Sequence, residues 1–120
     1  MNRLLIVDDA LIMRMKIREI AEQAGWTVVG EAKNGEEGVS LYSEHTPDLV
    51  TLDMVMPQMD GLAALKAIRA AAPDAQIVMV SAVDQKDKLT ECIASGAMDF
   101  IVKPFDDSRL SAFFERYRKS

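Results

Sequence analysis

Several side chains that can bind cations or phosphoryl groups stand at the ends of short apolar runs in this 120-residue chain. They are far apart along the sequence: Asp8 and Asp9 after 3–7, Asp53 at the end of 48–53, Ser81 at the end of 76–81, and Lys103 after 99–102. If these runs are parallel strands of one sheet, their carboxyl ends meet at one edge, where open α/β sheets bind ligands. The sequence therefore predicts a polar site built from carboxylates, a hydroxyl and an ammonium.

The aspartates of this predicted site create a repulsion that a metal ion would relieve. Two like charges about 4 Å apart repel by roughly 4 kcal/mol at an effective dielectric constant near 20. Carboxylate ligands with room for water suit Mg²⁺, and Mn²⁺ can take its place. With Asp8, Asp9, Asp53 and Lys103, one such ion gives zero formal charge. A neutral site can accept a phosphoryl group that an anionic site would repel.

Phosphoryl transfer needs mainly positioned groups and charge stabilisation, which suggests a role for each residue. Asp53 is the candidate nucleophile, giving an aspartyl-phosphate, because it stands alone at the central run. Asp8 and Asp9 are paired, as metal ligands would be. Lys103 would pair with one phosphoryl oxygen, and Ser81 would donate a hydrogen bond to another. Simpler explanations exist for single residues: Asp8 or Asp9 could cap a helix, and Lys103 could be a surface lysine.

The elements that must position these residues alternate between strand and helix. Strands are predicted at 3–7, 27–31, 48–53, 76–81 and 99–102. Helices are predicted at 10–24 with Gly25 as the stop, from an Asn34/Glu37 capping box, from Gly61 to before Pro73, at 84–95 before Gly96, and from Asp106 or Asp107 to the C-terminus. Continuous apolar strands separated by helices indicate a parallel sheet covered on both faces. The expected fold is α/β, a flavodoxin-like (βα)5 doubly wound sheet forming one domain over residues 1–120.

Composition narrows the classes of function. The net charge of −5 disfavours a nucleic-acid partner, and no apolar run is long enough to cross a membrane. We therefore expect a cytoplasmic protein. The single cysteine, Cys92, lies in a helical pattern and is expected to be a core residue, and the isolated His45 argues against a zinc site.

The combined motifs resemble the receiver domains of two-component response regulators, most closely the stand-alone chemotaxis regulators. Four segments carry the resemblance in order and spacing: LLIVDD, DLVTLDMVMPQMDG, VMVSA and DFIVKPF. The resemblance covers essentially the whole chain and implies the strand order 2-1-3-4-5. It also implies a phosphorylation switch rather than an enzyme with small-molecule turnover.

The resemblance assigns roles residue by residue. Asp53 is the implied phosphoacceptor, with Ser81 and Lys103 contacting the phosphoryl group. The implied Mg²⁺ ligands are Asp9 directly, Asp8 through water, Asp53, and the backbone carbonyl of Val55. Two further implications complete the set: Phe100 is the aromatic residue that turns inward when Ser81 moves, and the Lys103–Pro104 peptide bond is cis.

Partners are also implied by the resemblance. A histidine kinase would donate the phosphoryl group, and a downstream protein, in the chemotaxis case a flagellar motor switch protein, would read it. A phosphatase could remove it, and the protein is expected to be a monomer without an output domain. Phe100 stands where the chemotaxis pattern has tyrosine, and Val55 and Val83 replace polar residues that help place the attacking water. This predicts a comparatively long-lived phosphoryl group.

Other functions remain open at this point. The chain could be a receiver cut from a longer transcription factor, or an interaction module of the same fold that is not phosphorylated. An α/β aspartyl-phosphate phosphatase would need a second carboxylate two residues after its nucleophile, where this chain has Val55. A flavodoxin-like cofactor binder would need a phosphate-cradling loop after the first strand, where this chain has Asp8 and Asp9.

Overall fold

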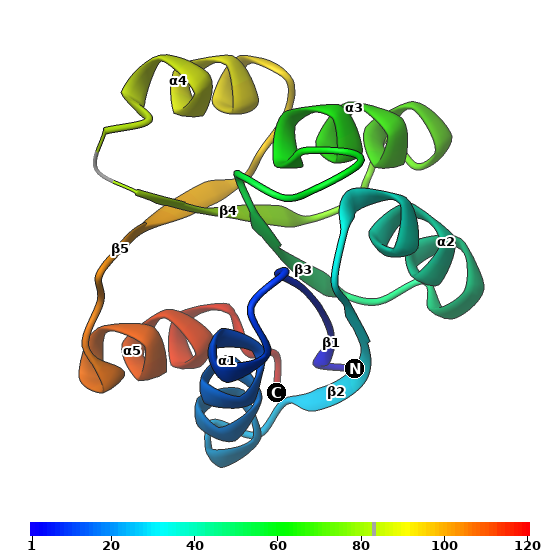
Figure 1. Cartoon of the computed structure of the whole chain (residues 1–120). Helices are drawn as coiled ribbons and strands as arrows, with labels where there is room; N and C mark the ends of the chain where they lie inside the picture. Colours follow the sequence, from blue (N-terminus) through cyan, green and yellow to red (C-terminus); the bar gives the residue numbers. More distant parts are fainter. Residues whose placement is uncertain (83) are drawn as a thin grey trace.

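A computed structural model describes residues 1–82 and 84–120, and in it strand and helix alternate along the chain (Figure 1). The elements in order are β1 (Arg3–Val7), α1 (Leu11–Gln23), β2 (Thr27–Ala32), α2 (Gly35–His45), β3 (Leu49–Asp53), α3 (Gly61–Ala71), β4 (Ile77–Ala82), α4 (Lys86–Ala94), β5 (Asp99–Lys103) and α5 (Asp107–Tyr117). Each predicted element is present, with boundaries that differ by a few residues at most.

The strands form one parallel sheet in the order β2-β1-β3-β4-β5, which confirms the predicted fold class. Helices α1 and α5 cover one face of this sheet, and α2, α3 and α4 cover the other (Figure 1). The chain leaves β1 toward one edge to form β2 and then returns to the other side of β1 as β3. The carboxyl ends of β1 and β3 therefore lie at the switch point in strand order, where such sheets bind ligands.

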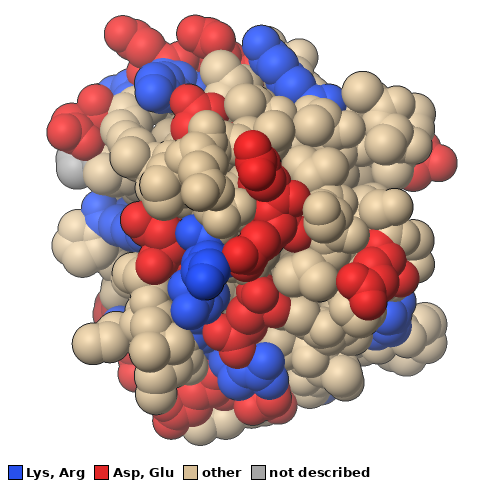
Figure 2. All heavy atoms as spheres, turned by 45° about the vertical axis from the view of Figure 1, so that its right-hand side comes forward, with Lys and Arg blue, Asp and Glu red and all other residues tan. Residues whose placement is uncertain are grey.

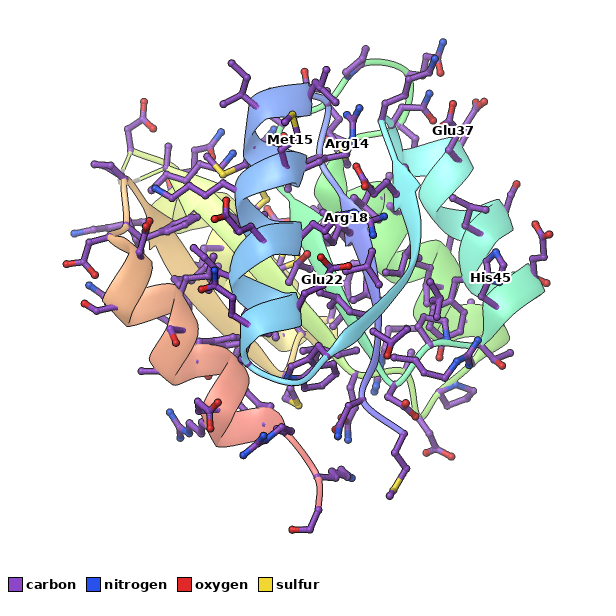
Figure 3. All side chains as sticks on the ribbon, turned by 90° about the horizontal axis from the view of Figure 1, so that it is seen from below. Arg14, Met15, Arg18, Glu22, Glu37 and His45 are labelled. Atoms are coloured by element: carbon purple, nitrogen blue, oxygen red, sulfur yellow. The ribbon has the colours of Figure 1, made fainter. Side chains whose placement is uncertain are left out.

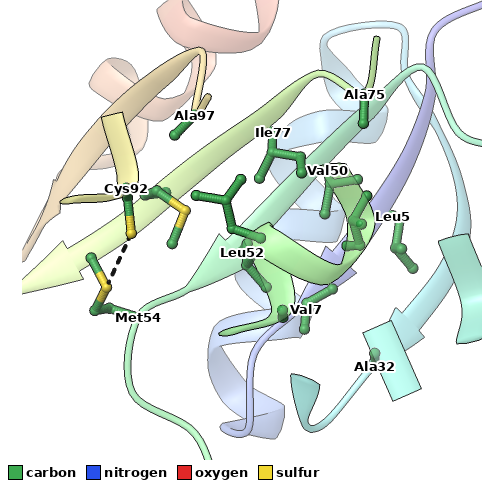
Figure 4. Close-up of a cluster of buried hydrophobic side chains, with 14 of the residues drawn as sticks. Leu5, Val7, Ala32, Val50, Leu52, Met54, Ala75, Ile77, Cys92 and Ala97 are labelled. Atoms are coloured by element: carbon green, nitrogen blue, oxygen red, sulfur yellow. Dashed lines mark hydrogen bonds between the residues drawn. The ribbon is translucent and has the colours of Figure 1, made fainter. Parts of the chain in front are cut away.

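Two apolar cores flank the sheet because alternate strand residues point to opposite faces. On β1, Leu4 and Ile6 pack under α1 and α5, whereas Leu5 and Val7 pack under the other three helices. In the second core, the thiol of Cys92 lies 3.7 Å from the sulfur of Met54 (Figure 4). Cys92 is fully buried, which confirms the expectation that it is a core residue.

The helix ends follow the predicted signals with two differences. Asn34 accepts a hydrogen bond from the Glu37 amide at 2.8 Å, but the Glu37 carboxylate accepts from the Lys33 amide, one residue earlier than the usual capping box. Helix α5 ends at Tyr117 instead of continuing to the terminus. The reason is that Lys119 exchanges two backbone hydrogen bonds with the side chain of Asn2, which ties the extended C-terminal segment to the N-terminus.

Candidate functional site

Three carboxylates converge above β1 and β3. Each of Asp8, Asp9 and Asp53 offers a carboxylate oxygen, and these oxygens all lie within 4.8 Å of one another. Asp8 and Asp53 are buried, with 1% and 7% of their surfaces exposed, whereas Asp9 is exposed. Asp53 is the last residue of β3, and Asp8 and Asp9 directly follow β1, so the parallel pairing of these strands brings them together.

The polar groups of Asp8 are held on several sides. Its amide donates to the carbonyl of Ala32 at 3.0 Å, and its Oδ1 accepts from the amide of Ala10 at 2.9 Å. Neither Asp8 nor Asp9 caps α1, because the N-cap residue is Ala10 and its side chain makes no capping hydrogen bond; Asp8 Oδ1 binds the amide of Ala10 itself and no amide within the first helical turn. The alternative explanation of these aspartates as helix caps is therefore wrong.

Lys103 bridges two of the carboxylates. Its Nζ lies 3.2 Å from Asp8 Oδ2 and 3.3 Å from Asp53 Oδ1, and the Lys103–Pro104 peptide bond is cis. Burial disfavours the charged ammonium, but the attraction of Asp53 and Asp8 outweighs burial, so the pKa of Lys103 is raised above its usual value. Lys103 is thus part of the acidic cluster and not an ordinary surface lysine.

One ammonium does not balance the acidic cluster. Burial, followed by the repulsion from Asp8, raises the pKa of Asp53 to about 6, although Lys103 acts in the opposite direction. Burial and the repulsion from Asp8 thus outweigh the attraction that Lys103 exerts on the Asp53 carboxylate. An oxygen-only donor set whose third member, Asp9, is exposed and open to water fits a hard divalent cation such as Mg²⁺.

The other predicted site residues lie on β4, β5 and the segment after β3. Ser81 is 1% exposed and directly follows Val80, which pairs with Asp53 across the two strands. The hydroxyl of Ser81 donates a hydrogen bond to the carbonyl of Ala82 at 3.0 Å. Val55 is 54% exposed beyond the end of β3. Phe100 is 44% exposed on β5, so in this state it is not a core aromatic residue. Val83 lies outside the described residues.

Two residues that support the site, Arg14 and Gly61, were given no such role in the sequence analysis, which named Gly61 only as the start of a helix. Arg14 donates from Nη1 to the carbonyl oxygen of Asp8 at 2.7 Å, and the amide of Gly61 donates to the carbonyl of Met54 at 2.8 Å, just after Asp53. A signal for Arg14 was present in the sequence. The helix dipole disfavours a cation near the N-terminus of a helix, and hydrogen bonds to acceptors outside the helix, as Arg14 makes, offset this cost.

Comparison with known proteins agrees with this geometry. The family model described as "Response regulator receiver domain" matches residues 4–115. The chain is 50% identical over 109 residues to the chemotaxis protein CheY of Bacillus subtilis, covering 91% of each chain. It is 48% identical over 119 residues to CheY of Listeria monocytogenes, covering 99% of this chain and all of that protein.

Among solved structures, the chain resembles a chain of the CheX–CheY–BeF3–Mg²⁺ complex from Borrelia burgdorferi. The TM-score is 0.88 at 34% identity, with 98% of this chain and 90% of that chain covered. The sheet order, the acidic cluster at its switch point and the match over nearly the full length all agree: the chain belongs to the response regulator receiver domain family.

Proposed function

We propose that this protein is a phosphorylation-activated signalling switch of a two-component system, with Asp53 as its phosphoacceptor. The observation that carries the proposal is the placement of Asp53 beside two further carboxylates and within 3.3 Å of the ammonium of Lys103. A buried nucleophile, a cationic group and an acidic cluster able to hold a cation are together the parts that phosphoryl transfer needs.

Asp8, Asp9, Asp53 and the backbone carbonyl of Val55 are the proposed ligands of Mg²⁺, for which Mn²⁺ can substitute. The raised pKa of Asp53 supports this assignment, because a nearby cation would favour the ionised carboxylate that acts as nucleophile. When bound, Mg²⁺ supplies positive charge that offsets the carboxylates and attracts an incoming phosphoryl oxygen.

In the proposed transfer, a carboxylate oxygen of Asp53 attacks the phosphorus of a phosphohistidine on a histidine kinase. A P–O bond forms, the P–N bond breaks, and the imidazole nitrogen keeps the electron pair and takes up a proton. Lys103 exchanges part of its contact with Asp53 for a phosphoryl oxygen. The hydroxyl of Ser81 leaves the carbonyl of Ala82 and donates to another phosphoryl oxygen.

The proposed response begins at Phe100, the switch aromatic residue. A cavity of about 660 Å³ lies beside its ring, and the cavity is lined mostly by apolar side chains of β4, α4 and β5, among them Ala82, Leu89, Ile93 and Val102. When the hydroxyl of Ser81 moves toward the phosphoryl group, Phe100 turns inward and reshapes the face formed by α4, β5 and α5. Such a switch needs two states that differ by only a few kcal/mol.

The surface around the site supports a protein as phosphodonor. Leu11, Ile12 and Val55 are 58%, 80% and 54% exposed, and all three lie in segments that adjoin the acidic cluster. Exposed apolar side chains beside a reactive group are typical of protein-binding surfaces.

Lysine and arginine side chains are interspersed with acidic ones on the face shown in Figure 2. Among the described residues, no helix is long and apolar enough to span a membrane.

The similarity to CheY proteins supports a role in chemotaxis, with a flagellar motor switch protein as the proposed target. In this proposal the protein is a cytoplasmic monomer whose residues 1–120 form a single receiver domain. A phosphatase would reset it, as the similarity to a chain of the CheX–CheY complex suggests. The protein would catalyse its own phosphorylation and dephosphorylation without turning over a small-molecule substrate.

The proposal is tested by intact-mass measurement after incubation with acetyl phosphate, with and without Mg²⁺, and with Asp53→Asn as the control. The expected result is a single phosphoryl adduct that requires Mg²⁺ and is absent from the control. The absence of any adduct at saturating Mg²⁺, or an equal adduct on Asp53→Asn, would contradict the proposal.

A further inference from the structure

The side chain of Arg14 links helix α1 to the loop that carries the paired aspartates. Its Nη1 donates to the carbonyl oxygen of Asp8 at 2.7 Å, and its Nε donates to Glu31 Oε1 at 3.1 Å. Only 14% of the Arg14 side chain is exposed. A guanidinium that donates in two fixed directions has little freedom to move, because its donors lie in one rigid plane.

The carbonyl of Asp8 belongs to the peptide unit that joins Asp8 to Asp9. Since a peptide unit is planar, holding its oxygen also restricts the direction in which the chain enters Asp9. The other contacts of this loop act elsewhere: the amide of Asp8 donates to Ala32, its Oδ2 pairs with Lys103, and its Oδ1 accepts from the amide of Ala10, which belongs to the next peptide unit, after Asp9. Arg14 is the side chain that holds the peptide unit between the two aspartates, on the opposite side of Asp9 from the Ala10 contact.

Glu31 on β2 holds Arg14 in this position. One carboxylate oxygen of Glu31 accepts from Arg14, and the other accepts from Arg18 Nε at 2.7 Å. Figure 3 shows Arg14 and Arg18 extending from α1 on the side of β2. Arg18 also pairs with Glu22, so the aspartate loop rests on an ion-pair network between α1 and β2.

We propose that Arg14 is a positioning residue for the divalent-cation site, and that it acts by holding the peptide unit between Asp8 and Asp9. This inference rests on the proposed function, because it takes the aspartates as metal ligands. Arg14 does not touch the metal in this proposal. It restricts the orientation of the Asp9 carboxylate, which is exposed and would otherwise have to be ordered when the cation binds.

The most informative variant is Arg14→Lys, because it keeps the positive charge and the aliphatic stem and removes only the planar pair of donors. Lysine presents a single ammonium and cannot reproduce the planar pair of donors that reaches both Asp8 and Glu31. Loss of a residue that orients a metal ligand typically weakens binding by about 10-fold or more. The matched control is Arg18→Lys, the same change on the same helix, in a residue that pairs with Glu31 without contacting Asp8.

The experiment measures Mn²⁺ affinity by the electron paramagnetic resonance signal of the free ion, followed by competition with Mg²⁺. Neither step requires phosphorylation. The expected result is that Arg14→Lys binds Mn²⁺ about 10-fold more weakly than the unmodified protein, while Arg18→Lys stays within about 2-fold. Thermal unfolding in EDTA is measured in parallel, to separate an effect on the site from a general loss of stability.

The proposal would be overturned if Arg14→Lys bound Mn²⁺ as tightly as the unmodified protein does. It would also be overturned if Arg18→Lys lost as much Mn²⁺ affinity as Arg14→Lys, or if the unmodified protein bound no Mn²⁺. If Arg14→Lys does not fold, Glu31→Gln provides the second test, with an expected affinity between those of the two arginine variants. The proposed function is judged separately by the acetyl phosphate adduct. A metal site that depends on Arg14 in a chain that forms no adduct would support this inference and contradict the proposed function.

Discussion

A Cβ atom added to Gly61 would lie 2.3 Å from the carbonyl oxygen of Asp53 and 2.8 Å from the Cα of Met54. Gly61 is the first residue of α3, and its amide donates to the carbonyl of Met54. Helix α3 therefore begins directly against the backbone that carries the proposed phosphoacceptor. Only a residue without a side chain permits this approach, because neither neighbouring group is a flexible side chain that can move away.

Gly61→Ala should displace the Asp53 backbone, destabilise the fold by roughly 1–3 kcal/mol, and slow acetyl phosphate labelling. Urea unfolding and intact-mass kinetics measure the two effects. The control is Gly30→Ala, whose added Cβ would approach the flexible end of the Leu5 side chain at 3.3 Å and which should be much better tolerated. Equal effects of the two substitutions would show that the contact with Asp53 is unimportant.

Asp53→Asn should stabilise the metal-free protein at neutral pH. The pKa of Asp53 is raised from 3.8 to about 6, so the folded protein binds this proton more tightly than the unfolded chain. The contribution of this proton to the free energy of unfolding is fully present below about pH 4 and is lost as the pH rises through about 6. At about 1.4 kcal/mol per pKa unit, Asp53→Asn should gain roughly 1–3 kcal/mol at pH 7.5, less any loss of its pairing with Lys103.

The measurement is urea unfolding in EDTA at several pH values. The advantage of Asp53→Asn should shrink as the pH falls from 7.5 toward 4. The exposed Asp74 offers a control, since Asp74→Asn should change stability by no more than about 0.5 kcal/mol. An advantage of Asp53→Asn that stays constant over this pH range would rule out the raised pKa as its cause.

Thr51→Val should stabilise the protein by about 1 kcal/mol. Thr51 is 2% exposed in β3, and its hydroxyl has no hydrogen-bond partner within the described part of the chain. Valine has nearly the same shape, suits a strand and removes the unpaired polar group. Thr51→Ser keeps the hydroxyl and loses a methyl group, so it should be destabilising. Urea unfolding of both variants provides the measurement, and a less stable valine variant would show that the hydroxyl is satisfied in solution.

Phe100→Trp should report the proposed switch through its fluorescence. The side chain at this position is 44% exposed beside an apolar cavity, so inward rotation should shift the emission to shorter wavelength when beryllium fluoride and Mg²⁺ are added. Trp26 gives a constant background, because it is buried and its Nε1 donates to the carbonyl of Phe114. Adding Ser81→Ala should reduce the shift, and an unchanged spectrum in the parent variant would count against rotation.

The phosphoryl group on Asp53 should persist for minutes rather than seconds in the purified protein. Val55 exposes an apolar side chain next to the site and offers no hydrogen bond to an attacking water. Val55→Asn supplies such a group and should shorten the half-life. Intact mass after removal of acetyl phosphate measures both, and a half-life of seconds in the unmodified protein would contradict the prediction.

The sequence by itself determined the fold class and the composition of the site. Alternating apolar strands and helices specify a parallel sheet, and in such a sheet the ends of neighbouring strands must meet at one edge. This pattern alone brings together Asp8, Asp9, Asp53 and Lys103, which follow or end four of the apolar runs. The strand order came from the resemblance to receiver domains, because the strand and helix pattern alone does not state it.

Tertiary structure decided which groups touch and which are buried. Asp8 and Asp53 are buried while Asp9 is exposed, and Lys103 bridges the two buried carboxylates; strand ends alone do not determine this. The contact of Arg14 with both Asp8 and Glu31 likewise depends on how α1 lies against β2. Sequence periodicity specifies which face of an element is apolar, whereas contacts between polar atoms depend on the relative placement of elements, which only packing of the whole chain determines.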